Sequence, residues 1–294
     1  MKSIAFVGLG NMGGPMAARL AARGFTLSVY DKRPEAVRAF LELHAGRAAD
    51  APADAGRGAD AAIMMLPDDD AVREVLLCGG GLVAGLRRGA VVIDMGTSDP
   101  RATIEVGMTL AARGIRYVDA PVMGGVAFAR DATLDVLVGG SDDDVDRCMP
   151  IFVALGRQVI RCGALGSGHT LKALANYVNA STLVTVIEAL TIGRKFGLDT
   201  TVMAGAMLHL CTGRQHPLEK KVIPHVLTGN SATGTALSLT AKDLAIATDL
   251  GRSIGVPLAG RMSELWYKAE HMFGGEANQA QVPRLWEERK TMSL

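Results

Sequence analysis

The feature that most constrains this chain is the segment Gly8-Leu9-Gly10-Asn11-Met12-Gly13, a GxGxxG sequence directly after an apolar run at residues 4–7. A helical pattern opens within it and covers residues 12–23. In a β-α-β unit the first glycine allows the tight turn, the second lets the main chain approach a pyrophosphate, and the third lets the helix pack closely on the strand. The helix N-terminus attracts phosphate. The segment therefore predicts a dinucleotide-binding unit.

Asp31 follows the next apolar run, at residues 26–30. A carboxylate at this place accepts hydrogen bonds from the ribose hydroxyls of the adenosine and repels a 2′-phosphate, which favours NAD. Lys32 and Arg33 follow at once, and their charges can bind such a phosphate. NADP therefore stays open as the alternative cofactor.

The first half of the chain alternates short apolar runs with helical patterns. The runs, expected as strands, cover residues 4–7, 26–30, 61–66, 90–94, 116–119, 134–138 and 158–162. Helical patterns between them include residues 12–23, 34–43 and 100–113. Strands that alternate with helices are typical of βαβ units, so we expect an α/β Rossmann-like domain with a parallel sheet.

The second half lacks this alternation. From Ser167, the expected N-cap, a helical pattern continues to Phe196, and Gly197 is the expected stop. Such a helix is about 45 Å long, which suits a connection between domains. Further helical patterns cover residues 201–210, 236–253 and 259–271. We therefore expect a dinucleotide-binding domain at residues 1–164 and an all-helical substrate and dimerisation domain at residues 165–294.

Composition excludes several classes of partner. The formal net charge is +1 and aromatic residues make up 4% of the chain, so neither nucleic acid nor a membrane surface is expected as a partner. The N-terminal apolar run stops at the glycine loop, unlike a signal peptide. Cys78, Cys148, Cys162 and Cys211 lack metal-ligand spacing and are expected as small buried residues with no metal site. Together these features predict a cytoplasmic protein.

Lys172 is the first candidate for proton transfer, because it lies at the expected domain junction, where clefts form. Asn176 lies four residues later, on the same helix face. His169, one turn earlier, is a rival, although a histidine at a helix start is expected to face solvent. Gly124 and Gly125 follow a strand, and their main-chain N–H groups can hold a carboxylate.

Four motifs in the same order along the chain resemble the β-hydroxyacid dehydrogenase family, which includes 3-hydroxyisobutyrate dehydrogenase. They are residues 8–24 (GLGNMGGPMAARLAARG), 119–125 (DAPVMGG), 166–176 (GSGHTLKALAN) and 241–244 (AKDL). The resemblance spans nearly the whole chain. It implies a Rossmann-like domain followed by an all-helical domain, and the NAD(P)-dependent interconversion of a 3-hydroxyacid with its semialdehyde.

The resemblance also implies roles for particular residues. The family's catalytic lysine, a general acid and base, falls on Lys172, and its partner asparagine falls on Asn176. Its substrate-carboxylate turn falls on Met123, Gly124 and Gly125. Its cofactor contacts fall on the glycine loop and on Met65, Leu66, Pro67, Thr97 and Lys242.

The chain departs from the family pattern at three positions. Met123 stands where the family has serine, Ala132 where it has glycine, and Ala175 where it often has a second asparagine. A thioether cannot donate the hydrogen bond that a serine hydroxyl gives to a carboxylate. All three changes fall in or near the substrate motifs, so we expect the redox chemistry to be retained and the choice of substrate to differ.

Two other functions remain open. The first is an imine or ketone reductase on the same scaffold, which Lys172 argues against and Met123 keeps open. The second is a non-catalytic, dehydrogenase-like binding protein. We also expect a homodimer or homotetramer, because Gly193, Gly197, Ala204 and Gly205 in the helical half allow close helix packing.

Overall fold

The computed structural model describes residues 1–213 and 258–275, together with residues 228, 237, 277, 281 and 285. Two compact units make up the chain, Met1–Tyr177 and Val178–Leu294, and each is described by itself. The boundary at residues 164 and 165 expected from the sequence stays a prediction.

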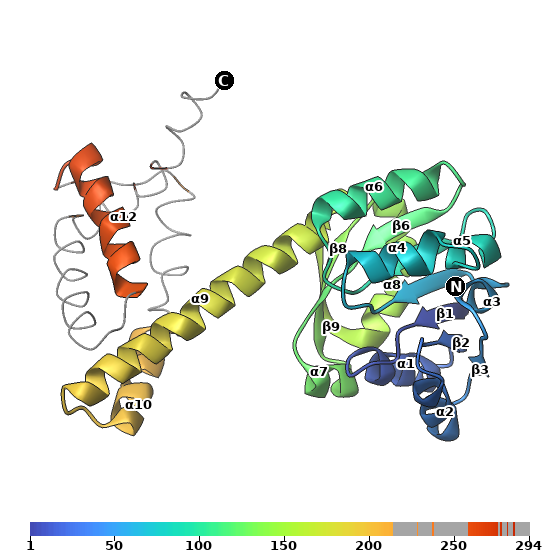
Figure 1. Cartoon of the computed structure of the whole chain (residues 1–294), viewed down its shortest axis with the longest axis horizontal. Coiled ribbons are helices and arrows are strands. Elements are labelled where there is room, and N and C mark those ends of the chain that lie inside the picture. Colours follow the sequence, from blue (N-terminus) through green and yellow to red (C-terminus); the bar gives the residue numbers. More distant parts are fainter. Residues whose placement is uncertain are drawn as a thin grey trace. The chain divides into compact units, whose positions relative to one another are not determined.

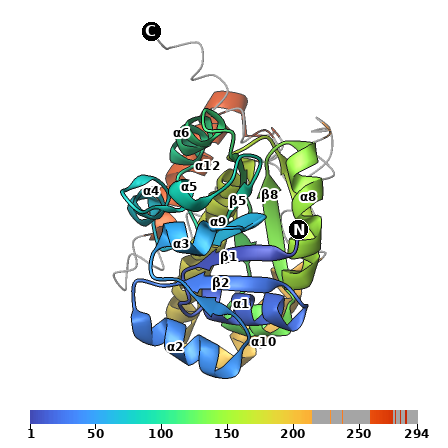
Figure 2. The same cartoon turned by 90° about the vertical axis from the view of Figure 1, so that its right-hand side faces the viewer.

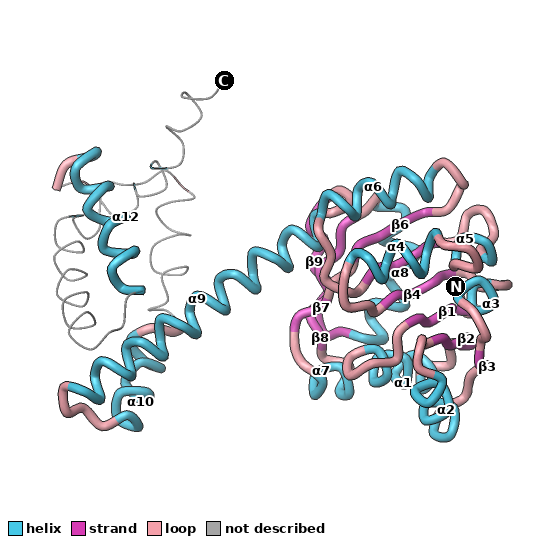
Figure 3. Tube along the Cα trace, viewed as in Figure 1, coloured by secondary structure: helices cyan, strands magenta, loops and turns pink. Residues whose placement is uncertain are grey.

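A nine-stranded sheet forms the centre of the first unit (Figure 3). The strand order is β3-β2-β1-β4-β5-β6-β8-β7, and β9 pairs with β8. The strands are β1 (Ser3–Val7), β2 (Thr26–Tyr30), β3 (Arg47–Ala48), β4 (Ala61–Met64), β5 (Val91–Asp94), β6 (Arg116–Asp119), β7 (Val122–Met123), β8 (Leu134–Gly139) and β9 (Gly156–Gly163).

Strands β1 to β6 pair in parallel, as the sequence predicts. Strand β8 runs antiparallel to β6 and β7 and parallel to β9. The connection from β7 to β8 holds only the short helix α7 (Val126–Asp131). A parallel return takes a crossover of about a dozen residues or more, so this connection favours the antiparallel pairing.

Helices cover both faces of the sheet, with α8 on one side and α4 and α5 on the other (Figure 2). The helices of this layer arrangement are α1 (Gly13–Ala22), α2 (Pro34–Leu43), α3 (Pro52–Gly56), α4 (Asp69–Leu77), α5 (Leu82–Gly85), α6 (Pro100–Ala111), α7 and α8 (Asp142–Leu155). Alternate residues of β1 enter different cores: Ile4 and Phe6 join one, Ala5 and Val7 the other. Burial on both faces explains why the strands read as continuous apolar runs.

Helix α9 (Ser167–Lys195) is one uninterrupted helix (Figure 1). It ends as predicted, because Gly197 takes φ +85° and the Leu198 N–H bonds to the Gly193 oxygen at 3.0 Å. At its start, the N–H groups of Gly166 and His169 donate to the Asp119 carboxylate. The Asp119 carboxylate in β6, and not the Ser167 side chain expected from the sequence, therefore accepts these two hydrogen bonds.

The second unit is described in part, through α10 (Thr200–Leu210) and α12 (Leu258–Phe273). Most of the helix predicted at residues 236–253 lies outside the described residues, and so does Lys242. None of the helices that the structure describes is long and apolar enough to cross a membrane.

The four cysteines are free thiols. Cys148 is buried, as expected, and Cys162 is half-buried. Cys78 and Cys211 are exposed, so the expectation of burial was wrong for these two. Cys78 comes directly after α4 and Cys211 directly after α10, where the chain leaves the packed helix.

Candidate active site

The glycine loop has the shape that its sequence predicts. Gly8 takes φ +96°, and a Cβ atom there would collide with the main-chain oxygen of Met65. A Cβ atom on Gly13 would collide with the Gly8 oxygen. Gly10 faces open space, with no atom within 4 Å of a Cβ placed on it. The loop is therefore closed against the protein at its ends and open at Gly10, where a pyrophosphate would approach.

Helix α1 presents its N-terminus beside this loop. Met12 is its N-cap residue, and no side chain of the described residues accepts a hydrogen bond there. Asn11, just before it, is exposed. The first amides of a helix need an acceptor, and phosphate oxygens are suitable acceptors. Open space at Gly10 and the uncapped helix start both fit a dinucleotide.

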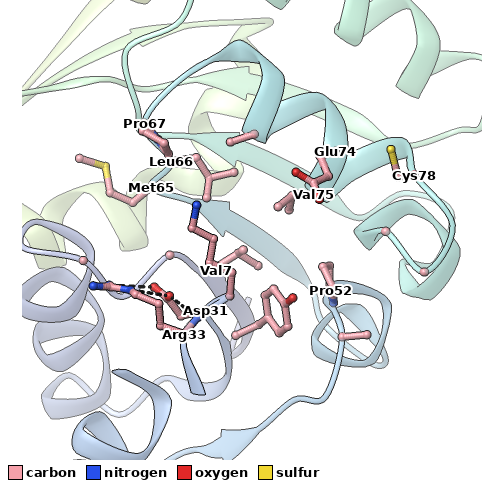
Figure 4. A pocket seen from close by; sticks show the side chains of 18 of the residues that line it. Val7, Asp31, Arg33, Pro52, Met65, Leu66, Pro67, Glu74, Val75 and Cys78 are labelled. Atoms are coloured by element: carbon pink, nitrogen blue, oxygen red, sulfur yellow. Dashed lines mark hydrogen bonds and ion pairs between the residues drawn. The ribbon is translucent and has the colours of Figure 1, made fainter. Parts of the chain in front are cut away.

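Asp31 lies at the carboxyl end of β2, with its side chain only 7% exposed. Its Oδ2 atom accepts the Leu9 N–H at 2.7 Å. Its Oδ1 atom accepts from the Arg33 Nε at 3.1 Å, as Figure 4 shows. Burial raises the pKa of Asp31, but the hydrogen bonds from Arg33 and Leu9 outweigh it and leave the pKa below its usual value. Asp31 is thus an ionised carboxylate that also supports the glycine loop.

A cavity of about 460 Å³ opens between this acid and the end of β4 (Figure 4). Of the predicted cofactor residues, its lining includes Gly8, Gly10, Asp31, Lys32, Met65, Leu66 and Pro67. The lining also includes residues that the sequence did not assign to the cofactor site, from α3, α4 and the loops beside them: Ala51, Pro52, Ala71, Glu74, Val75, Cys78, Gly79, Gly80 and Gly81. Nothing local in the sequence marks these residues, because they reach the cavity only through the packing of α3 and α4.

Leu9, Asn11, Met12, Gly13 and Thr97 do not line this cavity. Thr97 is exposed, on the loop that follows β5, and comes directly after Gly96. Two hydrogen bonds to buried Asp94 hold this loop. The carboxylate accepts from the Gly96 N–H at 3.0 Å and from the Ser98 hydroxyl at 3.0 Å. Thr97 is therefore held out from the sheet on an ordered turn.

The predicted site residues share one edge of the sheet. Asp31 follows β2, the glycine loop follows β1, Met65 follows β4, and Thr97 follows β5. Parallel strands end at the same edge, and neighbours lie about 4.8 Å apart, so these elements span about 14 Å. Ligands of open α/β sheets bind outside such carboxyl ends. A dinucleotide bound along this edge would have its adenosine at β2 and its nicotinamide toward β5 and β6.

Lys172 reaches this edge from the second turn of α9. Its Nζ atom donates to the main-chain oxygen of Val122 at 2.7 Å and lies 3.2 Å from the Sδ atom of Met123. Burial lowers the pKa of the Lys172 ammonium from its usual value. Asn176, one turn further along α9, is exposed. Lys172 and the DAPVMGG segment, distant in sequence, are therefore in direct contact.

The turn after β7 has an open main chain. Gly124 takes φ +116°, and a Cβ atom there would lie 2.9 Å from the Phe128 Cβ. Gly125 has nothing within 4 Å of such an atom, and both glycines are exposed. The main chain of the turn is therefore open at Gly125, and the partly buried Met123 side chain contacts the Lys172 Nζ atom.

His169 does not face solvent. Its side chain is fully buried, against the expectation for a histidine at a helix start, and its Nδ1 atom lies 2.8 Å from the Thr103 hydroxyl. The reason is tertiary: the first turn of α9 packs against the carboxyl ends of β5 and β6. Because its side chain is buried, His169 cannot exchange a proton with a substrate.

Comparison with known proteins covers both parts of the chain. Residues 3–163 match the NAD binding domain of 6-phosphogluconate dehydrogenase, and residues 166–286 match the family described as NAD-binding of NADP-dependent 3-hydroxyisobutyrate dehydrogenase. The chain is 36% identical to the 3-sulfolactaldehyde reductase of Escherichia coli K12, over 88% of this chain and 86% of the relative. It is 33% identical to the mitochondrial 3-hydroxyisobutyrate dehydrogenase of Mus musculus, over 90% and 81%.

Solved structures show the same architecture. The 3-hydroxyisobutyrate dehydrogenase of Mycobacterium tuberculosis with L-serine matches with a TM-score of 0.68 and 28% identity, over 97% of this chain and 99% of that one. An imine reductase variant from Myxococcus stipitatus with NAD⁺ matches with a TM-score of 0.86 over 97% and 99%, but at 20% identity it shows the fold alone. With the glycine loop, Asp31 and Lys172 in place, the chain belongs to the β-hydroxyacid dehydrogenase family of NAD(P)-dependent oxidoreductases.

Proposed function

We propose that this enzyme interconverts a 3-hydroxyacid and its semialdehyde, with Lys172 as the general acid and base. The observation that carries the proposal is the position of Lys172. Its partly desolvated Nζ atom meets the DAPVMGG turn at the edge of the sheet where a nicotinamide would lie. Burial lowers the pKa of Lys172, which raises the fraction of neutral amine available as a base.

In the oxidation direction, Lys172 accepts the proton of the substrate hydroxyl. NAD(P), when bound, would supply the redox chemistry as the acceptor of the hydride from the carbinol carbon. In the reverse direction, the Lys172 ammonium donates its proton to the aldehyde oxygen. The Val122 oxygen holds the Nζ atom at a fixed distance from the strand, so proton transfer takes place at one defined position.

The substrate acid is proposed to lie against the exposed main chain of Gly124 and Gly125. The relatives support this class, because their names include a hydroxyisobutyrate dehydrogenase and a sulfolactaldehyde reductase, which act on small anionic molecules. Met123 offers no hydroxyl to such an anion, so binding of the anion depends more on the main chain of Gly124 and Gly125. We propose a substrate whose anionic group needs fewer side-chain donors, or whose carbon chain contacts the thioether.

NAD is the proposed cofactor. Arg33 is the strongest local candidate for binding a 2′-phosphate, and it is engaged by the Asp31 carboxylate through Nε and through its main-chain N–H. A 2′-phosphate would have to replace that pair and would meet the negative charge of Asp31. Lys32 lines the same cavity, which keeps weak use of NADP open.

A substrate panel tests the proposal. Purified enzyme is assayed with 3-hydroxyisobutyrate, 3-hydroxypropionate, L-serine and sulfonated C3 alcohols, each with NAD⁺ and with NADP⁺. Lys172→Ala should lower turnover of the best substrate by about 10²–10⁴-fold, as for other general bases, while NADH still binds. Turnover of none of these alcohols, or near-normal turnover by Lys172→Ala, contradicts the proposal.

The second candidate is reduction of an imine or ketone on the same scaffold. Met123 favours it, since an apolar side chain beside the reacting centre suits a substrate without a carboxylate. Lys172 argues against it, because a reductase of this kind does not need a base in this place. Cyclic imines assayed with NADH and NADPH, beside the hydroxyacid panel, separate the two functions.

A homo-oligomer is proposed as the working assembly. Helix α10 exposes Val202, Leu208 and Leu210 by 70%, 66% and 68%, and a second copy of the chain is the partner that would cover such residues. Gly193 was expected to contact a second copy of the chain, but Met203 of the same chain packs against it. Light scattering at assay concentration tests the assembly, and a mass of one chain contradicts it.

A further inference from the structure

Polar side chains that are buried in the described part of the chain form one cluster. They are Asp94, Ser98, Thr103, Asp119 and His169. They come from the carboxyl ends of β5 and β6, the start of α6 and the first turn of α9. The Tyr117 hydroxyl joins them by donating to Asp94 at 3.2 Å. A sealed cluster of two acids and one histidine is costly to bury unless its charges compensate.

Asp94 controls the loop that presents Thr97. Its Oδ1 atom accepts the Gly96 N–H, and its Oδ2 atom accepts the Ser98 hydroxyl, so both neighbours of Thr97 are bonded to one carboxylate. Any movement of Asp94 would therefore shift Thr97.

Asp119 controls the helix that presents Lys172. Its Oδ1 atom accepts the Gly166 N–H at 2.7 Å, and its Oδ2 atom accepts the His169 N–H at 2.8 Å. These amides open α9, and Lys172 follows one turn later. Any movement of Asp119 would therefore shift Lys172.

The ring of His169 lies between the two acids. Its Nε2 atom is 3.9 Å from the Asp94 Oδ2, and its Nδ1 atom is 3.9 Å from the Asp119 Oδ2. Within the residues that the structure describes, neither carboxylate has an ion pair with a lysine or arginine, and the Nε2 atom has no hydrogen-bond partner. Among the described side chains, the imidazole is thus the one basic group beside both acids, of which Asp94 has a pKa that burial raises.

The protons of the ring follow from its neighbours. The Thr103 hydroxyl already donates to the Asp99 main-chain oxygen at 3.0 Å, so it is free to accept from an Nδ1–H group. On the other side, an unprotonated Nε2 atom would point its lone pair at the Asp94 carboxylate, which is repulsive. A proton on Nδ1 gives the Thr103 hydroxyl a donor, and a proton on Nε2 replaces the repulsion from Asp94 with attraction over 3.9 Å.

We propose that His169 is a positioning residue, a buried imidazolium that joins Asp94 to Asp119 and so holds the Thr97 loop and the Lys172 helix in fixed relation. Asp94 lies under the loop beside the nicotinamide site, Asp119 lies under the start of α9, and the cation draws both acids together. His169 touches neither substrate nor cofactor. The effect of His169 on the reaction rests on the proposed function, whereas the positive charge of its ring does not.

The charge is tested directly by ¹⁵N NMR of histidine-labelled enzyme without ligands. The ring is sealed from solvent, so its N–H protons exchange slowly. Near pH 8, His169 should show N–H correlations at both ring nitrogens, and both should be missing from His169→Gln. A correlation at one nitrogen alone would mean that the ring is neutral, and this result would overturn the proposed positive charge. In that case, either Asp94 carries the compensating proton or no group does.

The positioning role is tested by comparing His169→Gln with Thr170→Ala. Thr170 is the next residue, and its hydroxyl donates to the Gly166 main-chain oxygen at 2.8 Å, so its removal weakens the same helix turn without removing a bond to either acid. With 3-hydroxyisobutyrate and NAD⁺, His169→Gln should lower kcat about 10²-fold, as expected for misplaced reacting groups, with NADH affinity nearly unchanged. Thr170→Ala should keep kcat near that of the wild type.

Equal losses in both variants, or a normal kcat in His169→Gln, would overturn the positioning role. If the wild type oxidises no hydroxyacid, the proposed function fails, and the ring N–H correlations still decide the charge. If His169→Gln does not fold, the spectrum of the wild type decides it alone.

Discussion

Lys172 holds its Nζ atom 3.2 Å from the Sδ atom of Met123, on the turn where the family has a serine. The sulfur is a weak acceptor and gives no hydrogen to a substrate. It therefore lies beside the ammonium without competing strongly for it, and it leaves the substrate side of the turn without a hydroxyl donor. This contact links the main departure from the family pattern to the proposed catalytic group.

Met123→Ser should restore a donor for the substrate acid. A hydrogen bond to a charged group contributes about 1.5–3 kcal/mol, so KM for 3-hydroxyacids should fall about tenfold or more. Met123→Leu keeps the volume without the sulfur and should leave KM close to that of the wild type. Steady-state kinetics of the three proteins measures this, and an unchanged KM in Met123→Ser would show that Met123 does not border the acid.

The pH dependence should follow Lys172. Because burial lowers its pKa from 10.5, oxidation should rise with pH to a plateau with a midpoint below 10.5, as the neutral base forms. Aldehyde reduction should decline over the same range, as the acid form is lost. Lys172→Arg, which stays charged, should lack this limb in its residual activity. A midpoint at or above 10.5 in the wild type would contradict the assignment.

Asp31→Asn should weaken the preference for NAD. The change removes the negative charge and frees Arg33 from its ion pair, so the guanidinium can bind a 2′-phosphate. The ratio of kcat/KM for NADP⁺ over NAD⁺ should rise about tenfold, the size of one charged hydrogen bond. The double variant Asp31→Asn, Arg33→Ala should lose the gain. If the double variant keeps it, another group binds the phosphate.

Cys78 gives a direct probe of the cavity. It is an exposed thiol in the lining, while Cys211 is an exposed thiol in the second unit. NAD⁺ should slow the reaction of Cys78 with a maleimide and leave Cys211 as a reference within the same chain. Mass spectrometry of the two peptides measures both rates. Equal rates for Cys78 with and without NAD⁺ would place the cofactor elsewhere.

Ala132→Gly should stabilise the protein. Ala132 takes φ +56° at the C-terminal end of α7, a left-handed conformation that costs about 1 kcal/mol or more for a residue with a Cβ atom. After the entropy that glycine adds to the unfolded chain, a gain of about 0.5 kcal/mol remains. Ala127→Gly, at the exposed second position of α7, should destabilise by up to about 1 kcal/mol. Urea unfolding should show the opposite signs, and a loss in both would contradict the strain at Ala132.

The sequence by itself determined the dinucleotide unit. Gly8 and Gly13 are required by close main-chain approaches within one β-α-β unit, and Asp31 follows the very next strand, so all the needed information is local. The length and stop of α9 were also local, because a periodic pattern and Gly197 define them. The parallel order of β1 to β6 followed from the alternation of strands and helices.

Tertiary structure alone decided how these parts meet. Asp119 caps α9 from another strand, His169 is buried between Asp94 and Asp119, and Lys172 contacts Val122 and Met123. No pattern of spacing encodes such contacts, since each depends on where the ends of β5, β6 and β7 lie when α9 packs against them. Local periodicity specifies elements and their order, whereas burial, charge pairing and pKa arise only when distant segments exclude water together.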